Sequence, residues 1–191
     1  MMSAITSFSN RIAAPAALAA GAAWAADGVV QLIHPQTSSD TLVVGTAGYA
    51  NLALFVAALI LVSPAFVALG ERAGTTLARR AGITAAAGTF LLALTGITSL
   101  AHGRDYSFFP AVATVTNAAW LLGSIALAIA LKRTRTAPAW IAYGLPVAWI
   151  GTIPLATHGG GLITGAYWMV TSLLVLGTER VGLTAATTTT A

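Results

Sequence analysis

Asp27 is the residue of this chain whose type and position point most clearly to a chemical role. It stands inside an apolar run, whereas the remaining acids fall in expected loops or at the ends of expected helices. Those remaining acids are Asp40, Glu71, Asp105 and Glu179. A carboxyl group in hydrocarbon is costly, and an acid at such a position usually faces a bundle interior or a wet cavity. Burial favours the protonated acid, so Asp27 could donate a proton in an apolar site.

Asp27 shares one face of its expected helix with three other residues. They are spaced three and four residues apart, which places them on a single helical stripe: Trp24, Asp27, Gln31 and His34. The stripe is aromatic at its deep end and polar toward the end of the run. We therefore expect Asp27, Gln31 and His34 to be the catalytic residues, with Gln31 or an asparagine orienting the carboxyl group.

Polar and aromatic side chains are expected at a similar depth in the other apolar runs. If these helix faces converge, they line a cavity suited to a hydrophobic small molecule. The expected substrate-binding residues are Trp24, Tyr49, Asn51, Asn117, Trp120, Trp149 and Trp168. A structural interpretation stands beside this one, because Asn often joins membrane helices by hydrogen bonds and Trp and Tyr often form belts at the membrane interface.

The composition indicates what kind of fold must position these residues. Of the 191 residues, 57% are hydrophobic and 7% are charged, whereas a soluble domain is about a quarter charged. A helix needs roughly 20 apolar residues to cross the hydrocarbon core. The sequence therefore predicts an all-α, polytopic membrane bundle of six transmembrane helices. The expected spans are Ile12–Ile33, Gly45–Leu69, Ile83–Ala101, Ala111–Leu131, Ala139–Thr157 and Leu162–Gly177.

The spans fall into three successive helical hairpins that could be internal repeats. The first helix of each hairpin ends at a histidine, namely His34, His102 and His158. Parallel repeats of this kind occur in several membrane folds. Three histidines with an open position also form a catalytic zinc pattern. Their sequence spacings match no local metal motif, however, so we expect neither a metal nor another cofactor.

The basic residues predict the orientation of the bundle in a cell membrane. With the N-terminus in the cytoplasm, every Lys and Arg except Arg104 lies on the cytoplasmic side, as the positive-inside rule requires. This distribution explains the net charge of +4 without nucleic acid. Residues 1–183 then form one transmembrane domain, and the tail 184–191 is a disordered cytoplasmic segment. Residues 1–26 also resemble a signal peptide, but the apolar run continues beyond the candidate cleavage site.

Two compositional features narrow the chemistry and the source. The chain has no cysteine, which excludes disulfides, thiolate metal sites and a redox-active cysteine pair. Alanine, glycine and threonine are abundant and Lys132 is the single lysine. This usage is typical of a bacterial genome rich in G and C. No phosphate-binding loop, nucleophile elbow or zinc-protease motif is present in the sequence.

The size of the chain, the segment 24–28 (WAADG) with its embedded Asp27, and the aromatic helices carry a resemblance. The chain resembles the small integral-membrane terpene cyclases of meroterpenoid and prenyl-indole pathways. That resemblance implies a compact helical bundle whose embedded carboxyl group protonates an alkene or epoxide. Aromatic faces would stabilise the developing carbocation. Family members usually have seven helices and two key acids, whereas this sequence predicts six helices and one buried acid.

Two other classes of function stay open at this level. In a transporter or channel subunit, Asp27 would bind a cation or proton, and a homo-oligomer could complete the pathway. In a non-catalytic membrane scaffold, stretches of small residues such as 45–48 and 161–165 would serve close helix contact. In each case the lipid bilayer is the expected partner, and only the enzyme needs a hydrophobic small-molecule substrate.

Overall fold

The chain folds into six helices in this computed structural model, which describes residues 2–35 and 43–176, with side chains from 12–35 and 43–174. The helices are α1 (Met2–Ile33), α2 (Gly45–Ala73), α3 (Thr76–His102), α4 (Phe109–Thr134), α5 (Ala139–Thr152) and α6 (Gly160–Thr171). A short 3-10 helix, Ala156–His158, precedes α6, and a π-helix, Ser172–Leu176, follows it. Every element described is helical, which confirms the all-α class.

Four of the six helices are long and apolar enough to cross a membrane, namely α1 to α4. The 26 residues of α4 correspond to about 39 Å at 1.5 Å per residue, more than the roughly 30 Å of a hydrocarbon core. Helices α5 and α6 have 14 and 12 residues and are much shorter. The helices thus have the length and apolarity of a membrane protein, while six full-length spans and a threefold repeat stay predictions.

The fifth helix ends earlier than its apolar sequence predicts. It stops at Thr152, not at Thr157, so the predicted boundary was wrong. Pro154 lies just beyond the end, and a proline has no N–H to continue the helical ladder. The chain turns there instead, and the N–H of Leu155 donates to the carbonyl of Ile150 at 3.1 Å. The third hairpin is shortened as a result.

The third helix begins earlier than predicted, at Thr76 and not at Ile83. The side-chain oxygen of Thr75 accepts a hydrogen bond from the Ala78 N–H at 3.1 Å and caps the helix. Gly74, with φ +70°, ends α2 directly before this cap. Two residues therefore join α2 to α3, and the first turn of α3 carries Arg79 and Arg80. The threonine cap stabilises the start of the helix more than the two positive charges in its first turn destabilise it.

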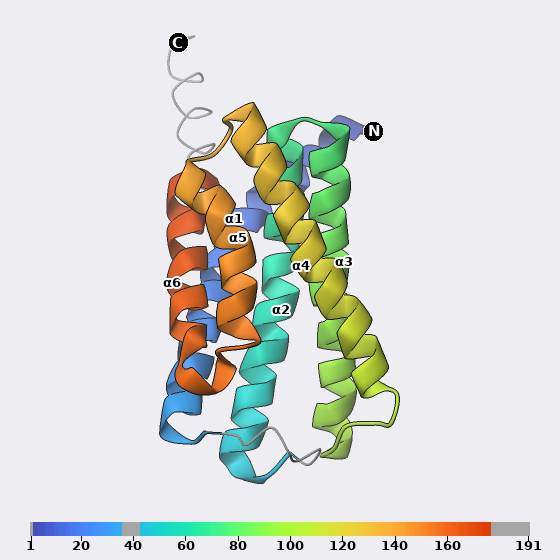
Figure 1. The fold of residues 1–191 in the computed structure, drawn as a ribbon, viewed down its shortest axis with the longest axis vertical. Coiled ribbons are helices and arrows are strands. Elements are labelled where there is room, and N and C mark those ends of the chain that lie inside the picture. The colour runs from blue at the N-terminus through green and yellow to red at the C-terminus, as the bar shows by residue number, and fades with distance from the viewer. Residues whose placement is uncertain (1, 36–42, 177–191) are drawn as a thin grey trace.

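The six helices form a closed ring in which each packs against the next in chain order. Figure 1 shows them running up and down along one axis, with α6 and α5 on one side and α3 and α4 on the other. Helix α1 packs extensively against both α2 and α6, which closes the ring between the first and last helices. The helices thereby enclose a central layer of side chains.

The contact between α1 and α6 depends on glycine. A Cβ at Gly165 would lie 2.6 Å from the carbonyl oxygen of Gly21, and one at Gly161 would lie 2.9 Å from the nitrogen of Gly28. Only hydrogen atoms fit between the two backbones, so the helices touch main chain to main chain. Such contacts are typical of small residues spaced four apart in membrane helices. We call these four residues the glycine seam.

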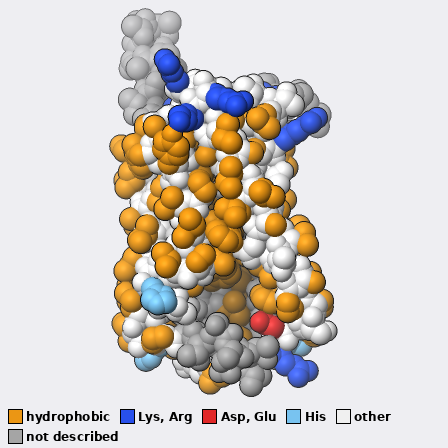
Figure 2. All heavy atoms as spheres, in the orientation of Figure 1, with side chains coloured by type: hydrophobic (Ala, Val, Ile, Leu, Met, Phe, Trp, Pro, Cys, Tyr) orange, Lys and Arg blue, Asp and Glu red, His pale blue; other side chains and the backbone are white. Residues whose placement is uncertain are grey.

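The basic side chains gather at one end of the bundle, as the sequence predicted. Figure 2 shows Lys and Arg at the upper end and a single basic group at the lower end. The described residues of the basic end are Arg72, Arg79, Arg80, Lys132, Arg133 and Arg135. The Nε of Arg72 donates to the carbonyl of Thr136 at 3.1 Å and joins two turns there. The predicted tail 184–191 and the boundary at 183 lie outside the described residues.

The glycine seam predicts a large effect for a single added methyl group. We expect Gly165→Ala to lower the thermal unfolding midpoint in mild detergent by several degrees, because overpacking against a rigid backbone costs about 1–3 kcal/mol. Gly96→Ala is a comparison in which the Cβ would meet a side chain and not a backbone, namely the Cγ2 methyl of Val56, at 2.5 Å. A wild-type midpoint for Gly165→Ala would contradict a backbone contact between α1 and α6.

Candidate functional site

Asp27 lies in the interior of the bundle, where the helical stripe placed it. The residue is 6% exposed, and Oδ1 makes no hydrogen bond within the described part of the chain. Gln31, one turn further along α1, is also 6% exposed. His34 follows the last residue of α1 and is exposed to the surroundings. The structure therefore brings the acid and the amide inside and leaves the histidine at the end of the bundle.

The rotation of α1 that buries Asp27 is set by its neighbour Gly28. A Cβ at Gly28 would lie 2.6 Å from the nitrogen of Leu162 in α6. Any larger side chain would push the helices apart, so this face of α1 must remain against α6. Asp27 lies about 100° around the helix from Gly28, and this turn directs it toward the bundle interior. The glycine seam thus positions the acid as well as closing the ring.

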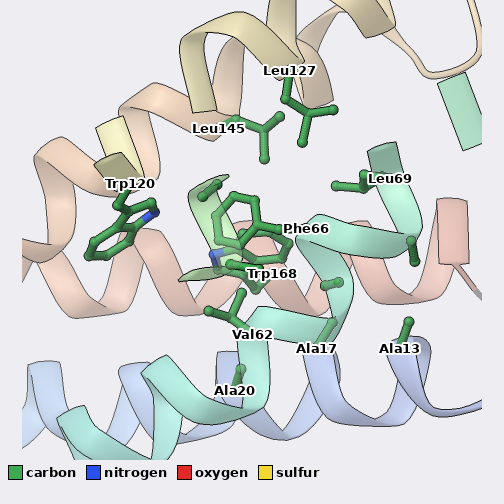
Figure 3. Close-up of a cluster of buried hydrophobic side chains, with 14 of the residues drawn as sticks. Ala13, Ala17, Ala20, Val62, Phe66, Leu69, Trp120, Leu127, Leu145 and Trp168 are labelled. Carbon is green, nitrogen blue, oxygen red and sulfur yellow. The ribbon is translucent and has the colours of Figure 1, made fainter. Parts of the chain in front are cut away.

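Three of the predicted substrate-binding tryptophans meet in the central layer. Trp24 stacks on Trp120 at 6.3 Å between ring centroids and on Trp168 at 6.5 Å. All three side chains are fully buried. Phe66 of α2 contacts Trp168 edge-on at 5.1 Å. Figure 3 shows Trp168 against Phe66, with Trp120 in the same layer. We call these four rings the aromatic layer.

The indole nitrogens of the aromatic layer have no hydrogen-bond partner among the described residues, although buried indole N–H groups usually find one. The rings are packed chiefly against one another. Trp24 lies one helical turn from Asp27, so the layer forms an apolar, π-rich wall beside the acid. The layer fills the centre of the bundle, and Trp24 is its member nearest to Asp27 along α1.

Helix α4 reaches this layer because of a second close backbone contact. A Cβ at Gly88 of α3 would lie 2.6 Å from the nitrogen of Trp120. The missing side chain lets α4 approach α3 and inserts the Trp120 ring into the centre. Glycines from α3 and α6 therefore determine how deeply Trp120 and Trp168 enter the layer.

Asn117 and Trp149 form a direct polar link between α4 and α5, in addition to the one from Lys132 to the hydroxyl group of Tyr143. The Nε1 of Trp149 donates to Oδ1 of Asn117 at 3.1 Å, and the Nδ2 of Asn117 donates to the carbonyl of Ala113 at 2.9 Å. Both side chains are half-buried. The amide thus joins two helices, as the structural interpretation of the asparagines anticipated. In Figure 2, the lower part of the face turned toward the viewer is hollowed, between α4 on one side and α5 and α6 on the other.

Tyr49 and Asn51 lie near the beginning of α2, at the end of the bundle opposite the basic residues. Tyr49 is 41% exposed, and its hydroxyl group lies against Gly103. Asn51 is half-buried, and its Oδ1 has no hydrogen-bond partner within the described residues. No hydrogen bond in the described part of the chain joins either residue to Asp27. The structure therefore leaves these two predicted residues near one end of the bundle.

The histidines do not assemble into a metal site in the described residues. Nδ1 of His102 lies 2.9 Å from the carbonyl oxygen of Thr98, and Nδ1 of His158 lies 3.1 Å from the Thr157 hydroxyl group. Each ring therefore interacts with its own chain segment. Within residues 2–35 and 43–176, no three His, Asp or Glu side chains form a group that could hold a metal ion.

Sequence reasoning missed the hydroxyl pairs that join neighbouring helices. Ser63 and Thr89 lie 2.9 Å apart between α2 and α3. The Thr152 hydroxyl group donates to Oγ1 of Thr164 at 3.2 Å, between α5 and α6. Serine and threonine are common in membrane helices, and nothing in their local sequence shows which ones face a neighbour. The available signal was only their position on the same face as buried small residues.

The link between α4 and α5 predicts a measurable coupling. In a double-mutant cycle of Asn117→Ala and Trp149→Phe, we expect a coupling free energy of about 0.5–1.5 kcal/mol, the range for hydrogen bonds between membrane helices. Thermal or denaturant unfolding in detergent would measure it. Thr114→Ala is the control on α4, because its hydroxyl group donates only to Pro110 of its own helix, at 2.8 Å. A cycle of Thr114→Ala with Trp149→Phe should give no coupling, and equal couplings in the two cycles would refute the link.

No protein-family model matches the chain, no curated protein matches it in sequence, and no solved structure matches its fold. Its function must therefore be inferred from its own residues and their geometry.

Proposed function

We propose that this chain is an integral membrane enzyme that acts on an isoprenoid or other lipid-like substrate, with Asp27 as its general acid. The observation that carries the proposal is the position of Asp27, which is buried in the bundle with an unbonded carboxyl oxygen beside a wall of tryptophans. An acid in a membrane helix is expensive to maintain and is by default a functional residue.

The chemistry that fits this site is cyclisation started by protonation. Asp27 would transfer its proton to one carbon of an alkene, or to an epoxide oxygen, and become a carboxylate. The substrate carbocation would be attacked by a second double bond of the same molecule, which closes a ring. Loss of a proton from a neighbouring carbon would then restore an alkene and return a proton to the site. No redox step is needed, and proton uptake and release balance.

The remaining predicted site residues have distinct places in this scheme. Gln31 lies on the same buried face of α1 and would orient the carboxyl group. Trp24, the ring of the aromatic layer that lies one helical turn from Asp27, would stabilise the carbocation by cation–π attraction. Asn117 and Trp149 would form part of the wall on the α4–α5 side, and Tyr49 would contact the substrate on its way in. His34, which is exposed, would exchange protons with water at the end of the helix.

The same geometry supports a second candidate, a non-catalytic scaffold, because the glycine seam and the aromatic layer are sufficient reasons for much of the interior. A transporter or channel subunit is the third candidate. It would need Asp27 to bind a proton or cation during flux. The three candidates differ in one respect that can be measured, namely what happens to a bound hydrophobic molecule when Asp27 loses its acidity.

Replacement of Asp27 by Asn tests the proposed enzyme. We expect wild-type protein to convert a bound isoprenoid, and Asp27→Asn to retain it unchanged with turnover lower by at least about 100-fold, the usual contribution of a general acid. Native mass spectrometry and lipid extraction of gently solubilised protein would measure the bound molecule. Asp105→Asn is the control, since this acid already accepts a hydrogen bond from Ser99 at 2.6 Å.

Two other results would overturn the enzyme proposal. Only bulk phospholipid in all three proteins, with equal thermal stability, would reduce Asp27 to a packing residue and favour the scaffold. Proton-coupled uptake of a solute into vesicles that disappears in Asp27→Asn, without chemical change of the solute, would favour the transporter.

We also propose that the bundle spans the cell membrane several times, with the basic end in the cytoplasm. Support comes from four apolar helices long enough to cross a bilayer and from the collection of Arg and Lys at one end of them. Cytoplasmic loops of membrane proteins carry an excess of these residues.

The absence of cysteine from the sequence makes this orientation easy to test. We expect Ser107→Cys, in the turn between α3 and α4, to react with a membrane-impermeant maleimide added to intact cells. Thr76→Cys, at the basic end, should react only after the cells are permeabilised. Both positions are exposed, so accessibility to the reagent depends on the side of the membrane. The reverse pattern of labelling would invert the proposed topology.

A further inference from the structure

A groove runs along the outer side of α2 and α3 and is separate from the site around Asp27. It has a volume of about 520 Å³ and is open along its length. The side chains that form most of it are Ile60, Pro64, Val67, Ile83, Ala87 and Phe90. The groove therefore offers an almost wholly apolar surface.

The hydroxyl group in the wall of the groove is already satisfied. Ser63 donates to the carbonyl of Leu59 at 2.9 Å and lies 2.9 Å from the hydroxyl of Thr89. Thr89 itself donates to the carbonyl of Ala86 at 3.0 Å. A polar ligand would find no free hydrogen-bonding group here, whereas a hydrocarbon chain would fit without leaving a polar atom unpaired.

Two positively charged side chains lie beyond the groove, on its side toward the basic end of the bundle. Arg79 and Arg80 lie four and three residues before Ile83, on the face of α3 that carries Ala87 and Phe90 one and two turns further on. Both arginines are exposed. Arg80 is about 4.5 Å along the helix axis from Ile83, and the groove extends about 10 Å beyond Ile83. Charge and apolar groove thus fall within the depth of one leaflet of a bilayer.

The charges around the arginines leave an excess of positive charge. Glu71 of α2 lies near enough to Arg79 to interact electrostatically with it. Arg72 donates to the carbonyl of Thr136, in the turn between α4 and α5. Glu71 therefore offsets part of the charge of Arg79, and Arg80 remains available to an anion at the same end of the groove.

We propose that this groove is a binding site for an anionic phospholipid, with the phosphate held by Arg79 and Arg80 and one acyl chain seated between α2 and α3. The cationic head, the apolar floor and the leaflet-scale distance between them match the two halves of such a molecule. The site does not depend on the function proposed for Asp27.

Lipid binding in mixed detergent micelles tests the proposal. Phosphatidylglycerol and phosphatidylcholine with identical acyl chains are the probes, and native mass spectrometry counts the lipids retained. We expect wild-type protein to prefer phosphatidylglycerol, and the pair Arg79→Gln and Arg80→Gln to lower its affinity by roughly tenfold or more. The pair Lys132→Gln and Arg133→Gln, at the same end but on α4, is the matched control and should leave the affinity unchanged.

A variant of the groove itself tests the seat of the acyl chain. Ala87 is exposed in the groove, so Ala87→Trp should fill it without disturbing the core and should reduce retention of both lipids. If the double variant at Arg79 and Arg80 and the double variant at Lys132 and Arg133 lost equal affinity for phosphatidylglycerol, the lipid would be attracted diffusely to the basic end. That result would refute a binding site in the groove. A wild-type dimer that Ala87→Trp converts to monomer, with lipid retention unchanged, would assign the groove to a second copy of the chain instead.

Discussion

The direct contact between the backbones of α1 and α6 is the constraint on which the rest of the bundle depends. Apolar helices in lipid gain little from hiding hydrophobic surface, because lipid is itself apolar, and they associate chiefly through close packing and hydrogen bonds. The glycine seam supplies the close packing where the first and last helices meet. It closes the ring, fixes the rotation of α1 and brings Trp24 and Trp168 into stacking distance. The position of Asp27 in the interior is a consequence of that rotation.

Polar groups inside the bundle fall into two kinds. Hydroxyl groups such as those of Ser63 and Thr152, and the amide of Asn117, each have partners that hold helices together. The carboxyl oxygen Oδ1 of Asp27, the indole nitrogens of the aromatic layer, Oδ1 of Asn51 and the hydroxyl group of Ser124 have no partner within the described residues. A structural role accounts for the first kind without further assumption. The second kind is unusual in a folded protein, where buried polar atoms are nearly always bonded. Asp27 is the acid among those named, and it lies inside an apolar helix, which is why the proposed chemistry is centred on it.

The sequence predicted those features of the fold that depend on local spacing. The interior stripe of Trp24, Asp27 and Gln31 follows from intervals of three and four residues within one helix. The pairing of Gly21 with Gly165 could not be predicted, because it requires knowing that the first and last helices are neighbours. The convergence of Trp120 with Trp24 depends on the same long-range information. The early end of α5 could have been read from Pro154, but an apolar sequence on either side concealed it.

The shortness of α5 has a consequence for the surrounding lipid. Its 14 residues measure about 21 Å, roughly half the length of α2 and short of a typical hydrocarbon core. In the membrane topology proposed above, a bilayer that matches the length of α1 to α4 would be too thick for this hairpin, so lipid beside it would thin or bend its tails. Elastic deformation of this kind depends on membrane composition and tension. In that topology the two sides of the bundle would meet the bilayer differently, with a close match of length along α2 and α3 and a deformed leaflet beside α5 and α6.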